Sequence, residues 1–441
     1  MPVLAAREAL PGLLCRGPGA SAERVSLLEK AVGGRARTAS FFSWNGATLY
    51  AESAQGSRAD MTRTSEAQGA GPAVVDLFGG VGGLSLGACR AGFRLLAAVE
   101  VDERALAAHK RNFPSAVHLQ TDIAKLSGSA LLPALHLDAE RVDGVIGGPP
   151  CQGFSVMGHR CADDPRNELF AHFFRIVREV KPRFFLAENV PGIMSRQYSS
   201  MLDSALDGVR GTYTVLQPMR LAAHRYGAPT TRERVFILGY IPGELADLKP
   251  DGFAPPEEVE EVRVGQALKG LPRKIDSEWL SEKDGWRRVR PADKSYFGQR
   301  LDGEIPDGVG EAAAIQLLRS RHMVSGCLGT RHSAAVSMRY SRLASGEADA
   351  VSKAHRLDPN GFCPTLRAGT GKERGSYQAV RPIHPSEDRV ITPREAARLQ
   401  GFPDWFQFDR TKWHSFRQIG NSVSPILAEH ILSVVRKGLG D

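Results

Sequence analysis

Short apolar runs alternate with amphipathic stretches between residues 73 and 240. Apolar runs that end in glycine or in an acidic residue are typical of buried strands, and capping residues mark the helices between them. Asp102 is placed to cap a helix that continues to about Asn112, and Asp164-Pro165 opens another that continues to about Val180. The predicted strands are residues 73–78, 95–100, a segment ending near 120, 142–146, 184–187 and 235–240. Strands that alternate with helices predict a doubly wound, parallel α/β sheet.

The pattern changes on both sides of this region. Residues 1–70 are small, polar and basic, with one amphipathic stretch at 25–32, and predict a poorly structured extension in which Met61 is a candidate for the true first residue. Residues 241–388 hold many Gly and Pro without a clean period, which predicts a separate, smaller and irregular domain. Residues 389–441 return to helical patterns, and the apolar face of the last helix is expected to pack on residues 71–240.

Composition limits the class of protein. The chain has 441 residues, of which 42% are hydrophobic and 24% charged, so a mostly disordered or fibrous chain is excluded. No run of about 18 apolar residues is present to span a membrane. The six cysteines are far apart and form no CxxC pair, which fits a reducing cytoplasm, and no metal-ligand spacing is found. The net charge of +8 favours an acidic partner such as nucleic acid, although 44 of the 57 basic residues are Arg, and a GC-rich genome would also explain that.

A glycine-rich turn follows the first predicted strand at residues 79–83. Glycines allow positive φ and a close approach of the backbone to a ligand. Glu100 lies 20 residues after Gly80 at the end of the second strand, where a carboxylate can bind the two hydroxyls of a ribose. Asp122 follows the third strand and could accept a hydrogen bond from an adenine amine, and Phe78 could pack on the same group. The series predicts an adenosine-bearing cofactor, whereas a glycine-rich turn alone would indicate only a tight turn.

A cysteine follows the fourth strand in the sequence Pro149-Pro150-Cys151-Gln152. Ligands of open α/β sheets bind at the carboxyl ends of the strands, so this thiol is expected to face the ligand crevice. Isolated cysteines are more often small core residues, but the rigid Pro-Pro and the following Gly153 favour the functional interpretation. Glu188 ends the next strand and suits acid–base work on a substrate ring, although a helix-capping role would also explain it.

These motifs together resemble the DNA cytosine-5 methyltransferases. The resemblance rests on residues 76–83 (DLFGGVGG), 148–155 (GPPCQGFS), 188–190 (ENV), 232–234 (RER), 392–395 (TPRE), 400–403 (QGFP) and 418–423 (QIGNSV). Their order and spacing fit the family, and they cover residues 73–240 and about 388–436. The resemblance implies a Rossmann-like fold, S-adenosylmethionine as cofactor and a target-recognition domain between about Tyr240 and Arg389.

The resemblance also implies a set of residues that line the cofactor pocket. They are Phe78, Val81, Gly83, Glu100, Val101, Asp122, Ile123, Pro150, Leu169, Asn421 and Val423. Two of them, Leu169 and Val423, could equally be plain core residues. One departure from the family is visible, because Thr230 stands where the family usually has Gln before the Arg-x-Arg pair. Whatever that Gln normally binds is therefore in doubt.

The chemistry of cytosine implies roles for four residues. Cytosine C5 is a weak nucleophile, and addition of a thiolate at C6 makes it enamine-like, so a cysteine is needed and Cys151 is the candidate. By resemblance, Glu188 would bind N3 and the exocyclic amine, Arg234 would hold O2, and Arg232 would orient Glu188 or the backbone. The target cytosine would be flipped out of the duplex, and the loop that begins at Gln152 would close over the DNA.

The expected partner is double-stranded DNA. The residues expected to contact it are Gln152, Ser155, Arg319, Arg321, Arg331, Arg339, Arg342 and Arg367, and Thr365-Leu366 resembles an element of family recognition domains. Residues 319–381 hold 11 basic and 4 acidic residues, while residues 241–318 hold 11 basic and 16 acidic residues. A monomer in the cytoplasm is expected, with a cognate restriction endonuclease as a functional partner. The alternatives are a tRNA cytosine-5 methyltransferase of the same fold, which the insertion of about 150 residues disfavours, a non-catalytic DNA-binding protein, and a nicotinamide-dependent dehydrogenase.

Overall fold

The structure is a computed structural model that describes residues 40–44, 47–51, 71–135, 141–150, 167–369 and 379–440. The chain divides into two compact units, residues 1–67 and 68–441. In the first unit, strands β1 (Ser40–Trp44) and β2 (Ala47–Ala51) form an antiparallel hairpin. The predicted helix at 25–32 and the candidate start at Met61 lie outside the described residues.

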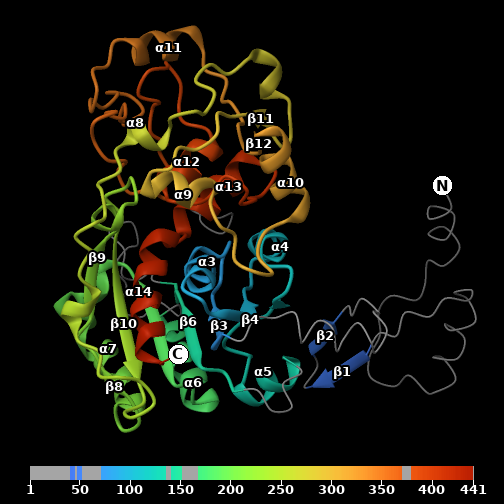
Figure 1. Cartoon of the computed structure of the whole chain (residues 1–441), viewed down its shortest axis with the longest axis vertical. Coiled ribbons are helices and arrows are strands. Elements are labelled where there is room, and N and C mark those ends of the chain that lie inside the picture. The colour runs from blue at the N-terminus through green and yellow to red at the C-terminus, as the bar shows by residue number, and fades with distance from the viewer. Residues whose placement is uncertain are drawn as a thin grey trace, which may run out of the picture. The chain divides into compact units, whose positions relative to one another are not determined.

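An eight-stranded sheet organises the second unit, with its strands in the order β5-β4-β3-β6-β7-β10-β8 and β9 paired to β10 (Figure 1). The strands are β3 (Ala73–Leu77), β4 (Arg94–Val99), β5 (Val117–Leu119), β6 (Gly144–Gly147), β7 (Phe184–Asn189), β8 (Thr214–Val215), β9 (Met219–Ala222) and β10 (Glu233–Tyr240). The five strands from β5 to β7 are parallel, as the alternating pattern predicts. Because these five strands all run in the same direction, their carboxyl ends meet at one edge of the sheet.

Strand β10 corrects the prediction of a fully parallel sheet. It runs antiparallel to β7, with Val235 opposite Asn189 and Phe236 opposite Glu188. It also pairs antiparallel with β8 and β9. The reason is local, because the short 3₁₀ turn Ala223–Tyr226 and the residues after it return the chain directly from β9 into β10, without a crossover helix. An apolar run predicts a strand but does not say in which direction the strand runs.

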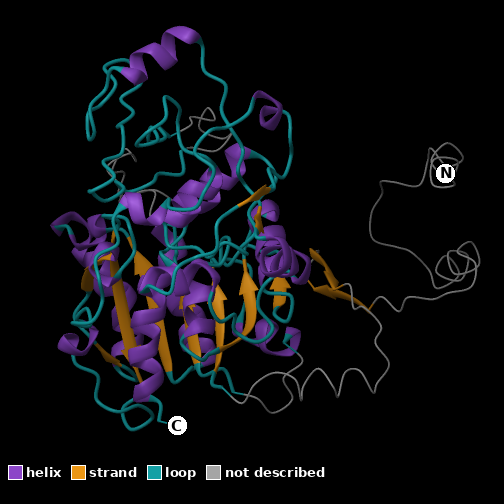
Figure 2. Cartoon of the chain, turned by 45° about the horizontal axis from the view of Figure 1, so that its top comes forward, coloured by secondary structure: helices purple, strands orange, loops and turns teal. Residues whose placement is uncertain are grey.

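Helices cover both faces of the sheet (Figure 2). One face packs on α3 (Gly83–Arg90), α4 (Glu103–Asn112) and α14 (Pro425–Gly438), and the other on α5 (Gly128–Ala134), α6 (Asn167–Val180) and α7 (Ser199–Arg210). Successive strand residues point to opposite faces, so Val74 belongs to the first core and Val75 to the second. Helix α14 packs directly on α3.

Polar residues precede several of the helices, and Asp102 caps its helix as predicted. The Asp102 side chain accepts hydrogen bonds from the Arg104 and Ala105 amides at the start of α4. Thr392 and Glu395 form a reciprocal capping box at α12 (Pro393–Leu399), and Ser424 precedes α14. The caps at α4 and α12 satisfy amides that have no partner within the helix, whereas the Ser424 side chain makes no such hydrogen bond.

Residues 241–390 contain short elements joined by long connections, in agreement with their irregular sequence pattern. They include α8 (Val264–Ala267), α9 (Tyr296–Asp302), α10 (Ala312–Arg321), α11 (Ala334–Ser341) and the β11 (Arg287–Arg288)–β12 (Met323–Val324) pair, and α13 (Lys412–Asn421) follows α12. Further 3₁₀ turns are Pro191–Met194, Arg196–Tyr198, Pro250–Phe253 and Ser277–Leu280. Among the residues that the structure describes, no helix is long and apolar enough to cross a membrane.

Candidate active site and cofactor pocket

The glycine-rich turn lies between β3 and α3, at the edge where the parallel strands end. Phe78, Gly80 and Gly82 all have positive φ, at 62°, 55° and 101°. A Cβ on Gly82 would lie 2.3 Å from the Phe113 ring, so only glycine allows this close approach. In contrast, a Cβ on Gly80 would meet nothing closer than 4.0 Å, which leaves the backbone open at the centre of the turn.

Glu100 is held rigidly beside this turn. One carboxylate oxygen accepts a hydrogen bond from the Gly80 amide at 2.9 Å, and the other accepts from the Val101 and Asp102 amides at 2.8 Å. Burial raises the pKa of Glu100 above its usual range, and these amides oppose the shift. The neighbouring Val101 side chain is 65% exposed. A fixed carboxylate beside an exposed apolar side chain and an open backbone fits the ribose and purine of an adenosine group.

The other expected pocket residues lie on several segments. A Cβ on Gly83 would lie 2.0 Å from Ser422 Oγ and 2.4 Å from the Val423 carbonyl, so the start of α3 directly contacts the segment after α13. Two distant parts of the sequence, Gly83 and Val423, are thereby brought together. The remaining expected residues divide by burial into buried Val81 and Ile123, half-buried Asp122, Pro150 and Leu169, and exposed Asn421.

The candidate catalytic carboxylate lies at the same edge of the sheet. Glu188 is the penultimate residue of β7 and is 8% exposed. Its Oε1 contacts Arg234 Nε at 2.6 Å in an ion pair in which both side chains are largely buried. Arg234 comes from the beginning of β10, and it reaches this edge because β10 runs antiparallel to β7.

The segment that precedes Cys151 contacts the end of β7. The Asn189 side chain donates a hydrogen bond to the Pro149 carbonyl at 3.3 Å. A Cβ on Gly148 would lie 3.0 Å from Glu188 Oε2. Cys151, Gln152 and Ser155 themselves lie outside the described residues, so their expected roles stay predictions.

Arg232 was expected to orient Glu188 or the backbone. Its buried side chain donates a hydrogen bond to the backbone carbonyl of Leu366 at 3.1 Å. The adjacent backbone also joins this region, with the Thr231 amide donating to the Cys363 carbonyl at 2.9 Å. Thr230 is fully buried here, and its Oγ1 accepts from the Arg232 amide at 3.3 Å. This part of the chain therefore connects β10 to the Thr365-Leu366 element.

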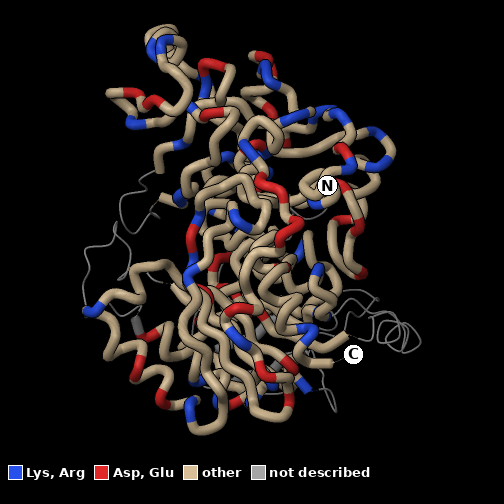
Figure 3. The backbone as a smooth tube through the Cα atoms, turned by 60° about the vertical axis from the view of Figure 1, so that its left-hand side comes forward, with Lys and Arg blue, Asp and Glu red and all other residues tan. Residues whose placement is uncertain are grey.

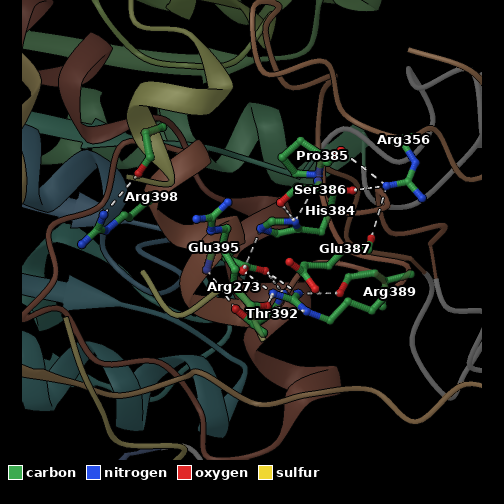
Figure 4. Close-up of polar contacts among 12 residues, drawn as sticks. Arg273, Arg356, His384, Pro385, Ser386, Glu387, Arg389, Thr392, Glu395 and Arg398 are labelled. Carbon is green, nitrogen blue, oxygen red and sulfur yellow. Dashed lines mark hydrogen bonds and ion pairs between the residues drawn. The ribbon is translucent and has the colours of Figure 1, made fainter. Parts of the chain in front are cut away.

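Figure 3 marks the basic and acidic positions along the backbone, and the arginines expected to contact DNA differ in exposure and partners. Those that are exposed are Arg319, Arg321, Arg331, Arg342 and Arg367. Arg339 is half-buried and forms a two-point contact with Asp349, at 3.1 and 3.3 Å. Arg356, which was not among the expected residues, is 6% exposed and binds Asp388 at 2.6 Å and the Tyr340 carbonyl. Figure 4 shows it beside the carbonyls of Pro385 and Glu387, so it stabilises the fold and is not available to phosphates.

The cluster in Figure 4 links this region to α12. Glu395 accepts from both terminal nitrogens of Arg389, at 2.7 and 2.9 Å, and also caps its own helix through the Thr392 amide. Arg389 also donates a hydrogen bond to the Arg273 carbonyl at 2.7 Å. A second buried pair, Arg398 with Asp404 at 2.6 Å, fixes the other end of the helix. These buried charges are fully paired, as such groups must be.

Two supporting residues of the site had no assigned role in the sequence. Asn189 holds the segment before Cys151, and the Gln400 side chain donates to the Ser422 carbonyl at 2.8 Å beside the cofactor turn. Asn189 belongs to the ENV motif and Gln400 to the QGFP motif, so their presence in family motifs was the feature of the sequence that could have indicated a role.

Comparison with known proteins agrees with this geometry. A family model described as C-5 cytosine-specific DNA methylase matches residues 73–437. The type II methyltransferase M.XorII of Xanthomonas oryzae pv. oryzae is 39% identical over 370 residues, covering 83% of this chain and 85% of its own. The type II methyltransferase M1.HphI of Haemophilus parahaemolyticus is 32% identical, covering 82% of this chain and 86% of its own.

A solved structure is similar as well. It is described as a DNA modification methyltransferase encoded within a prophage (E. coli), has a TM-score of 0.76 and 49% identity, and covers 84% of this chain and 100% of its own. A Dnmt2 methyltransferase of S. pombe, at 16% identity and a TM-score of 0.54, shares the fold. The motifs, the sheet with its paired Glu188 and Arg234, and these matches show that the chain belongs to the C-5 cytosine-specific DNA methylase family.

Proposed function

We propose that the protein transfers a methyl group from S-adenosylmethionine to C5 of a flipped-out cytosine in a specific sequence of duplex DNA, through a covalent bond between Cys151 and C6. The observation that carries the proposal is the Glu188–Arg234 pair, held at 2.6 Å beside Pro149, two residues before Cys151. The glycine-rich turn lies at the same edge of the sheet, so a cofactor and a base could meet there.

One set of residues would bind the cofactor and another would carry out the reaction. Glu100 would hold the ribose and Val101 the purine, and the bound cofactor would supply an electrophilic methyl group. Phe78, Val81, Gly83, Asp122, Ile123, Pro150, Leu169, Asn421 and Val423 would complete the pocket. Their positions around the turn and at the neighbouring strand ends support this assignment.

The reaction begins when the Cys151 thiolate adds to C6 of the cytosine, which moves electron density to C5. Glu188 would donate a proton toward N3 as negative charge develops on the ring, and Arg234 would hold both Glu188 and O2 of the base in place. C5 then takes the methyl group. Loss of the C5 proton to a base and elimination of the Cys151 thiolate restore the aromatic ring.

The relatives named type II methyltransferases support a role in restriction and modification. We extend this role to the present chain, which would protect DNA from a cognate restriction endonuclease in the cytoplasm and act as a monomer. Residues 241–388 would serve as the recognition domain, and the exposed arginines among them would contact phosphates or guanine edges.

A methyl-transfer assay tests the proposal directly. Purified protein is incubated with methyl-labelled S-adenosylmethionine and either duplex DNA or tRNA, and the labelled base is identified. We expect 5-methylcytosine in the DNA, and bisulfite sequencing of DNA from expressing cells would then give the target sequence. Label found only in tRNA would overturn the proposal.

The substitution Cys151→Ala tests the covalent step. We expect it to abolish turnover while DNA binding is retained, because the thiol forms the bond but does not position the duplex. Cys161→Ala is a matched control from the same segment and should keep its activity. Turnover near that of the unmodified protein in Cys151→Ala would contradict the mechanism.

A further inference from the structure

A continuous chain of hydrogen bonds lies beneath the cofactor turn, formed by residues for which the proposed reaction has no role. Ser85 Oγ lies 2.5 Å from Asp76 Oδ2 and 3.0 Å from His109 Nε2, and His109 Nδ1 lies 2.9 Å from His118 Nε2. Asp76, Ser85 and His109 are each at most 1% exposed, whereas His118 is only half-buried. The chain thus runs from a buried carboxyl group to the surface of β5.

The chain also supports the turn mechanically. Asp76 is the penultimate residue of β3, Ser85 lies in the first turn of α3, and His109 lies on α4. A Cβ on Gly79 would lie 3.5 Å from the His109 ring, and one on Gly82 would lie 3.1 Å from it. The glycine-rich turn therefore rests on the ring of His109.

Two proton arrangements satisfy the chain. In the first, His118 donates to His109, His109 donates to Ser85, and Ser85 donates to an ionised Asp76. In the second, a protonated Asp76 donates to Ser85, and each later bond is reversed, so that His118 accepts at Nε2 and carries its proton on Nδ1. The second arrangement holds exactly one more proton, which enters at His118 Nδ1 and leaves Asp76 neutral.

We propose that Asp76, Ser85, His109 and His118 form a proton relay beneath the cofactor turn, and that binding of the positively charged methyl donor weakens when the relay takes up its proton. The inference rests on the proposed use of S-adenosylmethionine. That cofactor carries one positive charge more than its demethylated product, so an ionised Asp76 favours the cofactor over the product. A neutral Asp76 loses this preference.

The charges around the relay agree with this assignment. Burial raises the pKa of Asp76 to about 7 and lowers the pKa of His118 to about 4 and that of His109 well below its usual value. The additional proton therefore resides on the carboxyl group near neutral pH. Asp76 Oδ1 has no hydrogen-bond partner among the described residues, which adds to the cost of ionising it.

The elements packed around Asp76 carry few competing charges. Glu100, which directly follows β4, raises the pKa of Asp76, and α3 contributes the buried thiol of Cys89. Lys110 of α4 lowers the pKa of His118. Strand β6 has no titratable residue between Gly144 and Gly147, and Glu429 of α14 is paired with Arg90 and Arg300.

Calorimetric titration of the full chain with S-adenosylmethionine and with S-adenosylhomocysteine tests the relay. The preference for the cofactor is the ratio of the two dissociation constants, and we expect it to fall by roughly fivefold between about pH 9 and about pH 6. In Asp76→Asn, the preference should not change with pH. In His109→Phe, the preference should fall at a lower pH than in the unmodified protein. Without His109, the Ser85 hydroxyl can donate only to an ionised Asp76, so the ionised form is favoured. His355→Phe, at an exposed position, is the matched control and should behave as the unmodified protein.

Two outcomes would overturn the relay. One is a preference that does not depend on pH in the unmodified protein, and the other is an unchanged pH dependence in both Asp76→Asn and His109→Phe. If neither ligand binds the unmodified protein at any pH, the proposed cofactor is wrong, and the relay is judged by NMR of the histidine nitrogens. There we expect His109 and His118 to exchange tautomers as the pH crosses neutrality, and fixed tautomers would refute the relay even without a ligand.

Discussion

Glu188 and Arg234 form an ion pair that is largely buried. Both side chains are about nine-tenths buried, and the 2.6 Å contact compensates for the loss of hydration. The pair holds a carboxyl group at the end of β7 in one orientation, beside Pro149. A catalytic group that is held in place before substrate arrives needs no reorganisation during the reaction.

Arg234→Met should therefore reduce kcat by about 10²-fold or more, because a positioned charge at the base is lost. The measurement is single-turnover methyl transfer at saturating cofactor, with DNA binding followed in parallel. Arg220→Met is the control, since Arg220 makes an exposed ion pair with Glu233 on the adjacent strand. Equal losses in both variants would indicate a general effect on this part of the sheet and would contradict the assignment.

At the scale of elements, the contact between α3 and α14 covers the face of the sheet on which α3 lies. It depends on Gly87, where a Cβ would lie 2.3 Å from the Ala428 Cβ and 2.6 Å from the Glu429 amide nitrogen. Glu429 also pairs with Arg300 at 2.9 Å, which joins α9 to the same two helices. Residues of α14 thus fix the position of α3, which begins at the proposed cofactor pocket.

Gly87→Ala tests this packing. Alanine favours a helix by about 1 kcal/mol over glycine, yet we expect a net loss of about 1–3 kcal/mol in the free energy of unfolding, because backbone must move to admit the methyl group. Urea denaturation measures the change. Gly211→Ala is the matched control, because φ is −72° and no atom lies within 4 Å of its added Cβ, so its stability should change by less than about 0.5 kcal/mol. If Gly87→Ala unfolds with the same free energy as the unmodified protein, the two helices can move apart without loss of stability, which would contradict the importance of this contact.

At the scale of the whole molecule, one apolar core continues from the sheet into residues 241–388. It includes Val74 and Phe236 of the sheet together with Leu268, Leu318 and Leu357. Residues 68–441 accordingly form one compact unit, and the proposed boundaries at 241 and 389 lie within it. The net charge is nevertheless uneven along the chain, with +7 in residues 319–381 and −5 in residues 241–318.

DNA binding should therefore weaken steeply with salt, and it should depend on arginines that lack carboxylate partners. Arg331 and Arg342 are exposed and form no ion pair among the described residues. Replacing either by Gln should reduce the slope of log Kd against log salt concentration by about 1. The measurement is duplex binding over a series of KCl concentrations. The control is Arg210→Gln, because Arg210 is already paired with Asp203 and Asp207, and a similar loss there would contradict a localised DNA surface.

Much of the fold was predictable because local interactions determine it. Asp102 was expected to begin a helix and does so, and strands β3, β4, β6 and β7 follow apolar runs that are largely buried on both faces. The very short strands β8, β9, β11 and β12 were missed, because two to four residues carry no periodic signal. The role of Arg339 could not be assigned from the sequence, since its pairing with Asp349 is set by the folding of the chain.

By itself, the sequence determined the parallel core, the family and the residues at the ends of its strands, because local patterns and spaced motifs encode them. Only the tertiary structure decided how these residues meet. Strand β10 runs antiparallel to β7, and for that reason alone Arg234, at its beginning, reaches Glu188 near the end of β7. A parallel β10 would have placed this arginine at the opposite edge of the sheet. Direction and pairing depend on contacts between distant segments, and no local pattern of hydrophobic residues contains that information.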